Sequence, residues 1–230
     1  MNQTNHRPIV AAMRRERMRT RLLAAALTLA AEHGLQAVTI DQVIAQAQVS
    51  RGTFYKYFDT PDALMLALGL TVSDAIIRTM HPFIDQLSDR AERVTVGIRS
   101  VLHLVSAYPT LGQFMVRSGW PITAADHAFV TLVGKDLQTG MKSGRFAPMP
   151  LEVAQSVLAG TLIGAMHAVT NRKQPKNFPV QTAAAVLRAL GIPADEALSL
   201  SNSALVLPVL ASDSQLSELV SLAPEMWPAH

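Results

Sequence analysis

Apolar residues recur along nearly the whole chain at intervals of three and four, which is the spacing that gives a helix one buried face. Few stretches alternate apolar and polar residues in the period of two that a strand requires. Leu23, Leu27 and Ala30 mark such a face in a first helix predicted over about residues 14–32, which Gly34 is placed to end. The pattern therefore predicts an all-α protein.

Local start signals divide the following stretch into three more helices. Thr39 and Gln42 have the spacing of a capping box, ahead of a helix that reaches about residue 47. Ser50 is suited to cap a third helix that ends near residue 58. Thr60 followed by Pro61 begins a fourth helix, expected to reach about residue 80, because proline fits the first helical position.

The second half of the chain continues in the same way. The segment 151–170 is apolar on nearly all sides, so we expect it to be buried on more than one face. No run of about 18 apolar residues occurs, so we expect no membrane span. From residue 194 onward we expect one or two short helices. The other helices expected here cover about residues 94–105, 110–116, 123–144, 151–170 and 180–190.

Composition and charge add a bias toward one end of the chain. Of the 230 residues 49% are hydrophobic, enough for a sizeable core, and the absence of cysteine fits a reducing cytoplasm. Residues 1–58 contain eight Lys and Arg against three Asp and Glu, whereas the remainder is slightly acidic. This asymmetry predicts that only the N-terminal end meets a polyanion, although a solvated basic tail would have the same charge.

Residues 39–58 have the pattern of two short helices joined by a tight turn at Gln48 and Val49. An ordinary helical hairpin has such a pattern too, but the polar and aromatic residues left outside the shared core favour a DNA-binding helix-turn-helix. The residues expected in that core are Ile40, Val43, Ile44, Ala47, Val49, Phe54 and Phe58. Those left outside it are Arg51, Gly52, Thr53, Tyr55, Lys56 and Tyr57.

The same stretch resembles the DNA-binding domain of the TetR family of transcriptional regulators over about residues 15–70. The residues that carry the resemblance are Gly34-Leu35, Thr39-Ile40, the run 43–58 (VIAQAQVSRGTFYKYF) and Ala63-Leu64. The resemblance implies a three-helix DNA-binding domain over residues 1–60 and a larger helical ligand-binding and dimerisation domain over residues 61–193. Residues 194–230 form a C-terminal tail to which we assign no role.

The resemblance also implies roles for individual residues at the DNA. Phosphate contacts are expected from Thr39, Ser50 and Tyr55. The residues expected to face the major groove, where arginine pairs with a guanine edge, are Arg51, Gly52, Thr53, Lys56 and Tyr57. Further contacts to the backbone or the minor groove are expected from Arg14, Arg15, Arg17 and Arg19.

Two positions depart from the family pattern. The family usually has glycine where this chain has Gln48, so a positive φ there would cost roughly 1 kcal/mol. The family often has lysine where this chain has Pro61, preceded by Asp59. One expected phosphate contact is therefore missing.

The family forms dimers through its last two large helices, which correspond here to residues 151–170 and 180–190. Small residues that permit close helix approach are Ala154, Gly160, Gly164, Ala165 and Ala168. Core packing within one protomer would use the same residues. Since glycine within a helix costs roughly 1 kcal/mol relative to alanine, a packing reason is expected for both glycines.

A mostly apolar cavity for a small molecule is expected among the middle helices. Its predicted lining is His103, Met115, Trp120, His127, Phe129, Met141, Met166 and His167. Each of these residues is equally suited to an ordinary core. His103 and His167 interrupt apolar faces and are the expected polar anchors, with hydrogen-bonded core histidines as the alternative.

These observations predict a cytoplasmic transcriptional repressor whose homodimer binds a palindromic operator in double-stranded DNA and is released by a small, mostly apolar effector. We expect no cofactor, no metal site and no enzymatic activity, because phosphate-binding, metalloprotease and nucleophile-elbow motifs are absent and the seven histidines are scattered. The alternatives are a nucleoid or division-site factor without an effector and a small-molecule-binding protein with a weakened DNA-binding domain. Operator, effector and regulated genes are not determined, nor whether the effector releases or recruits DNA.

Overall fold

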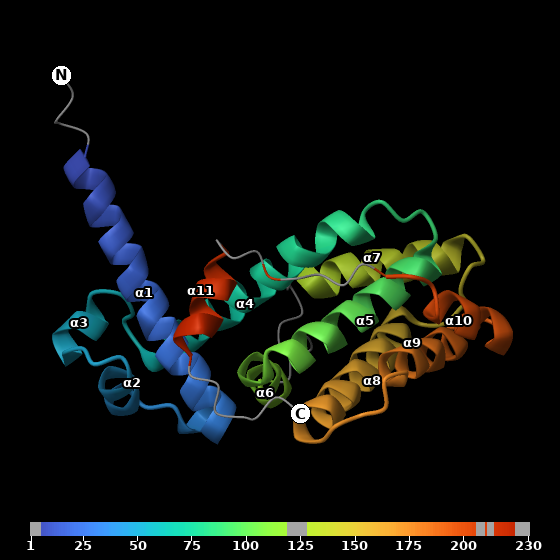
Figure 1. Ribbon diagram of the computed structural model, residues 1–230. Coiled ribbons are helices and arrows are strands. Elements are labelled where there is room, and N and C mark those ends of the chain that lie inside the picture. The colour runs from blue at the N-terminus through green and yellow to red at the C-terminus, as the bar shows by residue number, and fades with distance from the viewer. Residues whose placement is uncertain (1–5, 119–127, 206–209, 211–213, 224–230) are drawn as a thin grey trace.

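The structure of the protein is a computed structural model that describes residues 6–118, 128–205, 210 and 214–223 (Figure 1). Its regular elements are helices, and no strand occurs among the described residues, which confirms the all-α prediction. In chain order they are α1 (His6–His33), the 3₁₀ turn η1 (Leu35–Ala37), α2 (Ile40–Gln46), α3 (Arg51–Tyr55), α4 (Pro61–Ile84), α5 (Arg90–Ala107), α6 (Pro109–Arg117), α7 (Ala128–Lys142), α8 (Leu151–Asn171), α9 (Phe178–Ala189), α10 (Ala194–Ser201) and α11 (Gln215–Leu222).

The helices form a small head, α1 to α3, and a larger body, α4 to α10 (Figure 1). The central helix α5 packs against α6, α7, α8 and α9. The C-terminal half of α1 is buried against α6, so the head and the body share one hydrophobic core. The helix α11 lies beside α1 and α4, where it contacts both the head and the body.

The predicted helix starts in the head are present. The Gln42 side chain accepts the backbone N–H of Thr39 at 3.0 Å, and the Thr39 hydroxyl accepts the backbone N–H of Gln42, which completes the capping box. The Ser50 side chain accepts the N–H of Thr53, and Thr60 in the same way caps α4. These caps satisfy backbone donors that the first turn of a helix leaves unpaired.

The turn between α2 and α3 has the conformation that its family pattern implies. Gln48 has φ 51°, and it is the one non-glycine residue with positive φ among those the structure describes. The positive φ on which the predicted energetic cost depends is therefore present, and the cost itself stays a prediction. The only side-chain bond of Gln48 in the described structure is a long one, 3.4 Å from an Arg21 nitrogen to its amide oxygen.

Three boundaries in the first four helices differ from the prediction by three residues or more. The helix α1 begins at His6, about eight residues before the predicted start. Residues 11–17 are exposed and bury no apolar face, so the apolar pattern did not indicate that they are helical. The helix α3 ends at Tyr55 rather than near residue 58. The helix α4 continues past Pro82 to Ile84, since a proline near the C-terminal end interrupts few of the hydrogen bonds of a helix.

Candidate DNA-binding surface and effector cavity

Two buried aromatic rings hold the head together. Phe54 of α3 is fully buried, and its ring centroid lies 6.2 Å from that of Phe58. The guanidinium of Arg19 lies over the Phe58 ring at 5.8 Å, a cation–π arrangement that links α1 to the residues that follow α3. This packing leaves the opposite side of α3 facing outward.

The residues predicted to face the groove lie mainly on that outward side. Arg51, Gly52 and Lys56 are exposed, whereas Thr53 and Tyr57 are half-buried. Tyr55, which is predicted to contact phosphate, is also exposed. Gly52 lies in the first turn of α3, and a Cβ added there would meet one atom, Ser50 Oγ at 3.9 Å. The start of the helix is therefore open to close approach by a large partner.

The residues predicted to bind phosphate lie at the same surface. Thr39 and Ser50 are exposed cap residues at the N-terminal ends of α2 and α3. The Ser50 and Thr53 hydroxyls lie 2.9 Å apart, so they share one hydrogen bond. Helix N-terminal ends attract anions because their N–H groups carry partial positive charge.

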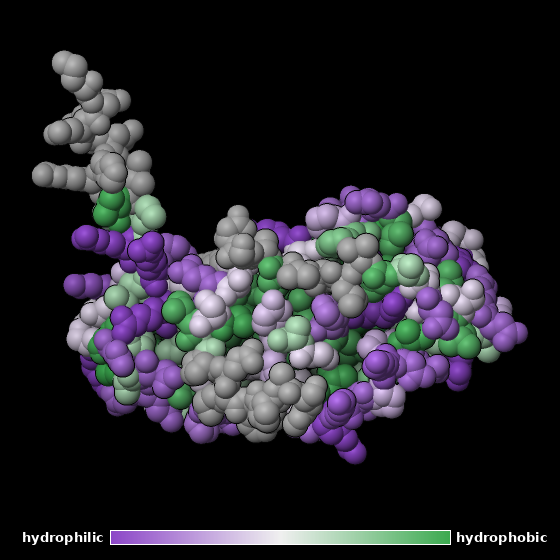
Figure 2. All heavy atoms as spheres, viewed as in Figure 1, coloured by the Kyte–Doolittle hydropathy of each residue, from purple (hydrophilic) through white to green (hydrophobic). Residues whose placement is uncertain are grey.

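The exposed part of α1 projects beyond the head, and Figure 2 shows mainly hydrophilic residues where it leaves the head. Arg14 and Arg15 line an open groove between α1 and α3, together with Lys56. The remaining lining is Val10, Ala11, Met18 and Tyr57. Arg17 is exposed, whereas Arg19 is partly buried beside Phe58 and Glu16.

An exposed ion pair links the two helices of the helix-turn-helix. Arg51, the first residue of α3, donates from Nη2 to Oδ1 of Asp41 in the first turn of α2. This carboxylate raises the pKa of Arg51 above its ordinary value. The pair was not expected from the sequence, although both side chains lie within the resembling stretch.

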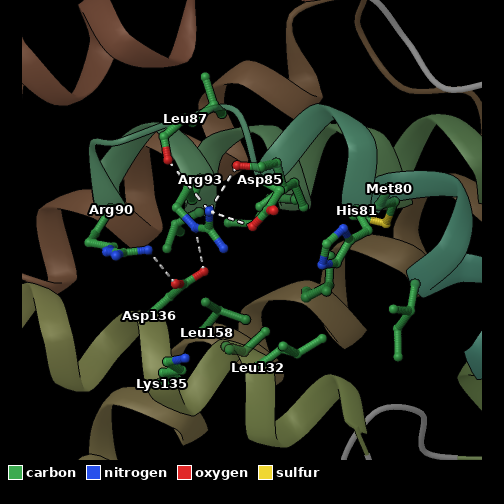
Figure 3. A pocket seen from close by; sticks show the side chains of 17 residues that line it. Met80, His81, Asp85, Leu87, Arg90, Arg93, Leu132, Lys135, Asp136 and Leu158 are labelled. Carbon is green, nitrogen blue, oxygen red and sulfur yellow. Dashed lines mark hydrogen bonds and ion pairs between the residues drawn. The ribbon is translucent and has the colours of Figure 1, made fainter.

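A cavity of about 440 Å³ lies between α4, α5, α7 and α8 in the body (Figure 3). The polar residues that line it include His81, Arg90, Arg93 and Asp136. Its apolar lining is Ile77, Met80, Ile84, Val94, Ile98, Leu132, Val133, Leu158 and Leu162. The cavity therefore suits a molecule that has both an apolar part and a polar end.

The polar end is organised around Asp136 of α7. Its two carboxylate oxygens accept hydrogen bonds from Arg90 Nη1 and Arg93 Nε of α5, each at 2.8 Å. Arg93 also donates from Nη1 to the carbonyl oxygen of Ile84 at 2.9 Å. The Asp136 and Arg93 side chains are only 15% and 14% exposed, so these charge-assisted bonds are shielded from bulk water.

The predicted effector-cavity residues that the structure places do not line this cavity. Trp120, His127 and the side chain of Phe129 fall outside what the structure describes. Met115 and Met166 are fully buried, and Met141 is half-buried. None of the predicted side chains that the structure places is among the residues that line the cavity.

The two histidines predicted as polar anchors differ in environment. His103 is partly buried in α5, and this burial lowers its pKa below the ordinary value. His167 is exposed on α8, where its ring Nδ1 lies 3.1 Å from the side-chain nitrogen of Asn171.

The sequence contains a signal for the polar cavity residues that we did not predict. Asp136 is a charged residue beside Val133 and Leu137 in a predicted helix, and Arg90 and Arg93 directly precede the apolar stripe of α5. Charged groups adjoining an apolar face are rarely buried unless they are paired.

The small residues of α8 divide between two environments. Ala154 and Ala165 are buried within the protomer, and Ala168 is half-buried. Gly160 and Gly164 are exposed, and a Cβ added at either position would meet no described residue within 4 Å. Packing within the protomer therefore accounts for the alanines but leaves both glycines without a close neighbour.

Two helices, α4 and α8, are long and apolar enough to cross a membrane by length and composition. The core helices of soluble proteins pass the same test, and both helices are partly buried in this fold. This is weak evidence for a membrane protein.

A helix-turn-helix head that shares a core with a cavity-bearing helical body is the architecture of a one-component, ligand-responsive DNA-binding regulator. Residues 22–68 match the profile of bacterial regulatory proteins of the tetR family, and residues 89–202 match that of the tetracyclin repressor-like C-terminal domain. The chain belongs to the TetR family of transcriptional regulators. The predicted family is thereby confirmed.

Individual relatives agree with this assignment. An HTH-type transcriptional regulator of Mycobacterium tuberculosis, Rv1255c, is 28% identical over 113 residues, which cover 49% of this chain and 56% of the relative. The chain thus matches about half the length of this curated relative.

Solved structures extend the likeness over most of the chain. RolR without ligand is 26% identical, with a TM-score of 0.67, over 83% of this chain and 100% of that chain. RolR in complex with resorcinol is 25% identical, with a TM-score of 0.58, over 87% of this chain and 100% of that one. The regulator FadR from Bacillus subtilis, in complex with stearoyl-CoA, is 18% identical (TM-score 0.57; 74% and 96% coverage) and shares the fold alone.

Proposed function

We propose that this regulator is a cytoplasmic repressor: a homodimer binds a palindromic operator and leaves it when a small molecule enters the cavity. The observation that carries the proposal is that α4 directly follows the helix-turn-helix and also lines the cavity. The helix α4 begins six residues after α3 ends, and it contributes Ile77, Met80, His81 and Ile84 to the cavity. A ligand that favours another position of α4 would therefore change the position of the head.

Binding of DNA is supported by the exposed cationic and hydroxyl groups of the head. Arg51 and Lys56 lie on the outward side of α3, and Arg14 and Arg15 line the neighbouring groove. One helix-turn-helix makes few base contacts, whereas two related by a twofold axis read a palindrome.

A twofold interface through α8 and α9 is supported by the open glycines of α8. Gly160 and Gly164 would let a second helix approach closely, and they cost helix stability although no described residue of the protomer lies within 4 Å of an added Cβ. The partner proposed for this surface is a second copy of the chain.

The proposed effector is a compact amphipathic molecule, more polar at one end than the sequence suggested. Its apolar part would pack on residues such as Leu158, while its polar end would bind to Asp136 or Arg93. Resorcinol, the ligand of RolR, has this character and is the first compound to test.

The proposal is tested by binding of the purified protein to DNA upstream of its own coding sequence, with random DNA as control, over a salt series. A twofold-symmetric footprint that disappears when resorcinol or a related small molecule is added would support it. Equal binding of both DNAs that collapses as salt rises would contradict a specific repressor, because only the phosphate contacts would then be present.

The effector site is tested separately with Leu132→Trp, which places a large ring at the cavity. Leu132 lines the cavity and is 40% exposed, and the matched control Leu198→Trp changes a residue of α10 that is 41% exposed and does not line it. We expect Leu132→Trp to raise the effector concentration needed for release by about tenfold or more, since a filled pocket loses its ligand contacts. Unchanged release would place the effector elsewhere.

A further inference from the structure

The ion pair between Arg51 and Asp41 is unusual for its location. Their side chains are 56% and 74% exposed, and such exposed pairs contribute little to folding stability. Asp41 also adds a negative charge to the surface that would meet phosphates, where an acid weakens binding. Asp41 stabilises α2 modestly, as an acid in the first turn of a helix does, but general affinity for DNA does not explain a carboxylate that binds Arg51.

The hydrogen bond occupies only one edge of the arginine. Asp41 accepts from Nη2, and the described residues offer no partner to Nε or Nη1 of Arg51. A guanidinium is planar and rigid, so a carboxylate that holds one nitrogen also sets the direction of the other donors. Each two-donor edge of a guanidinium includes Nη2. The N–H of Nη2 that does not bind Asp41, together with Nη1 or Nε, therefore forms the edge that matches the O6 and N7 acceptors of guanine in the major groove.

We propose that Asp41 is a specificity-determining positioning residue, which orients Arg51 toward one guanine in each half-site. This inference rests on the proposed DNA-binding function. Without Asp41, the long side chain of Arg51 would be free to bind phosphates, which are equally available at every sequence. The Asp41 carboxylate thus lowers the general affinity for DNA and increases the discrimination between bases.

The experiment compares the full-length protein with Asp41→Asn and with the control Asp62→Asn. Asp62 is also an exposed acid in the first turn of a helix, but no cation pairs with it in the described structure, so the control removes the same charge without releasing Arg51. A library of randomised half-sites first gives the preferred operator of the wild type. Binding is then measured for each single-base change, and melting curves verify that the variants are folded.

We expect the wild type to prefer guanine at one position of the half-site by about tenfold or more, as a bidentate arginine contact provides. Asp41→Asn should lose most of this preference, keep the preferences at other positions and bind random DNA at least as tightly. Asp62→Asn should keep the wild-type profile. An unchanged profile in Asp41→Asn, or the same loss in Asp62→Asn, would overturn the proposal.

A double-mutant cycle isolates the route through Arg51. Arg51→Ala should lose the same base preference, and adding Asp41→Asn to it should change nothing further. An additional loss in the double variant would mean that Asp41 contacts a base itself, contrary to the proposal. A wild type without any sequence preference would overturn the proposed function together with this inference, whereas a specific wild type with an unaltered Asp41→Asn overturns the inference alone.

Discussion

At the scale of single residues, Gln48 is a non-glycine residue in a backbone conformation that favours glycine. Its φ of 51° lies in the left-handed region, in which a side chain crowds the following carbonyl group. The tight turn between α2 and α3 requires this conformation, because the two helices must cross to share Val43, Ala47 and Phe54 in their core. Among the described residues, the Gln48 side chain forms only one hydrogen bond, a long one from Arg21.

We therefore expect Gln48→Gly to raise the free energy of unfolding by roughly 0.5–1 kcal/mol. Relief of about 1–2 kcal/mol of left-handed strain should exceed the roughly 0.5–1 kcal/mol that glycine costs through a more flexible unfolded chain. Urea unfolding followed by circular dichroism measures this difference. The control Gln46→Gly changes an exposed helical residue of α2 and should destabilise the protein instead.

At the scale of elements, one arginine joins three parts of the body that are distant in the sequence. Arg145, which follows α7, donates two bonds of 2.8 and 2.7 Å to the carboxylate of Asp89, the cap of α5. It donates a third, of 2.6 Å, to Glu196 in the first turn of α10. The Arg145 guanidinium, more than any other cause, holds the pKa of Asp89 below its ordinary value.

This network predicts a pH-dependent contribution to stability. The folded pKa of Asp89 is lowered, so its contribution is complete above the unfolded value of about 3.9 and is lost as the pH falls through the folded pKa. Asp89→Asn keeps a good capping residue but loses the charge, so it should destabilise the protein by about 1–2 kcal/mol at pH 7, as expected for a partly exposed pair. Melting temperatures of both proteins should begin to converge as the pH falls below about 4 and should meet below the folded pKa of Asp89. A constant difference down to pH 2 would contradict this origin.

At the scale of the whole molecule, the proposed repressor depends on a second protomer, and α8 provides the place to test it. A Cβ added at Gly164 meets nothing within 4 Å among the described residues, so Gly164→Gln should fold at least as stably as the wild type and yet weaken a dimer that packs on this face. Sedimentation equilibrium measures the association. The control is Gly69→Gln in α4, where an added Cβ also meets nothing within 4 Å. Equal dimerisation of all three proteins would place the interface elsewhere.

The sequence by itself determined the features that depend on neighbours within a few residues. The caps at Thr39, Ser50 and Thr60 and the strained turn at Gln48 were all predictable, because each is decided by hydrogen bonds or backbone sterics within one turn. The helix-turn-helix core was predictable for the same reason, since its two helices are adjacent in the chain.

Only the tertiary structure decided where charged and small residues face. Asp136 meets Arg90 and Arg93 across 46 and 43 residues of sequence, and no periodicity reports such a pairing. Likewise, the sequence does not distinguish among the small residues of α8. Packing of α8 against α5, α6, α7 and α9 buries Ala154 and leaves Gly164 exposed. Long-range contacts are set by how whole helices pack, whereas the pattern within one helix shows only that a face is apolar.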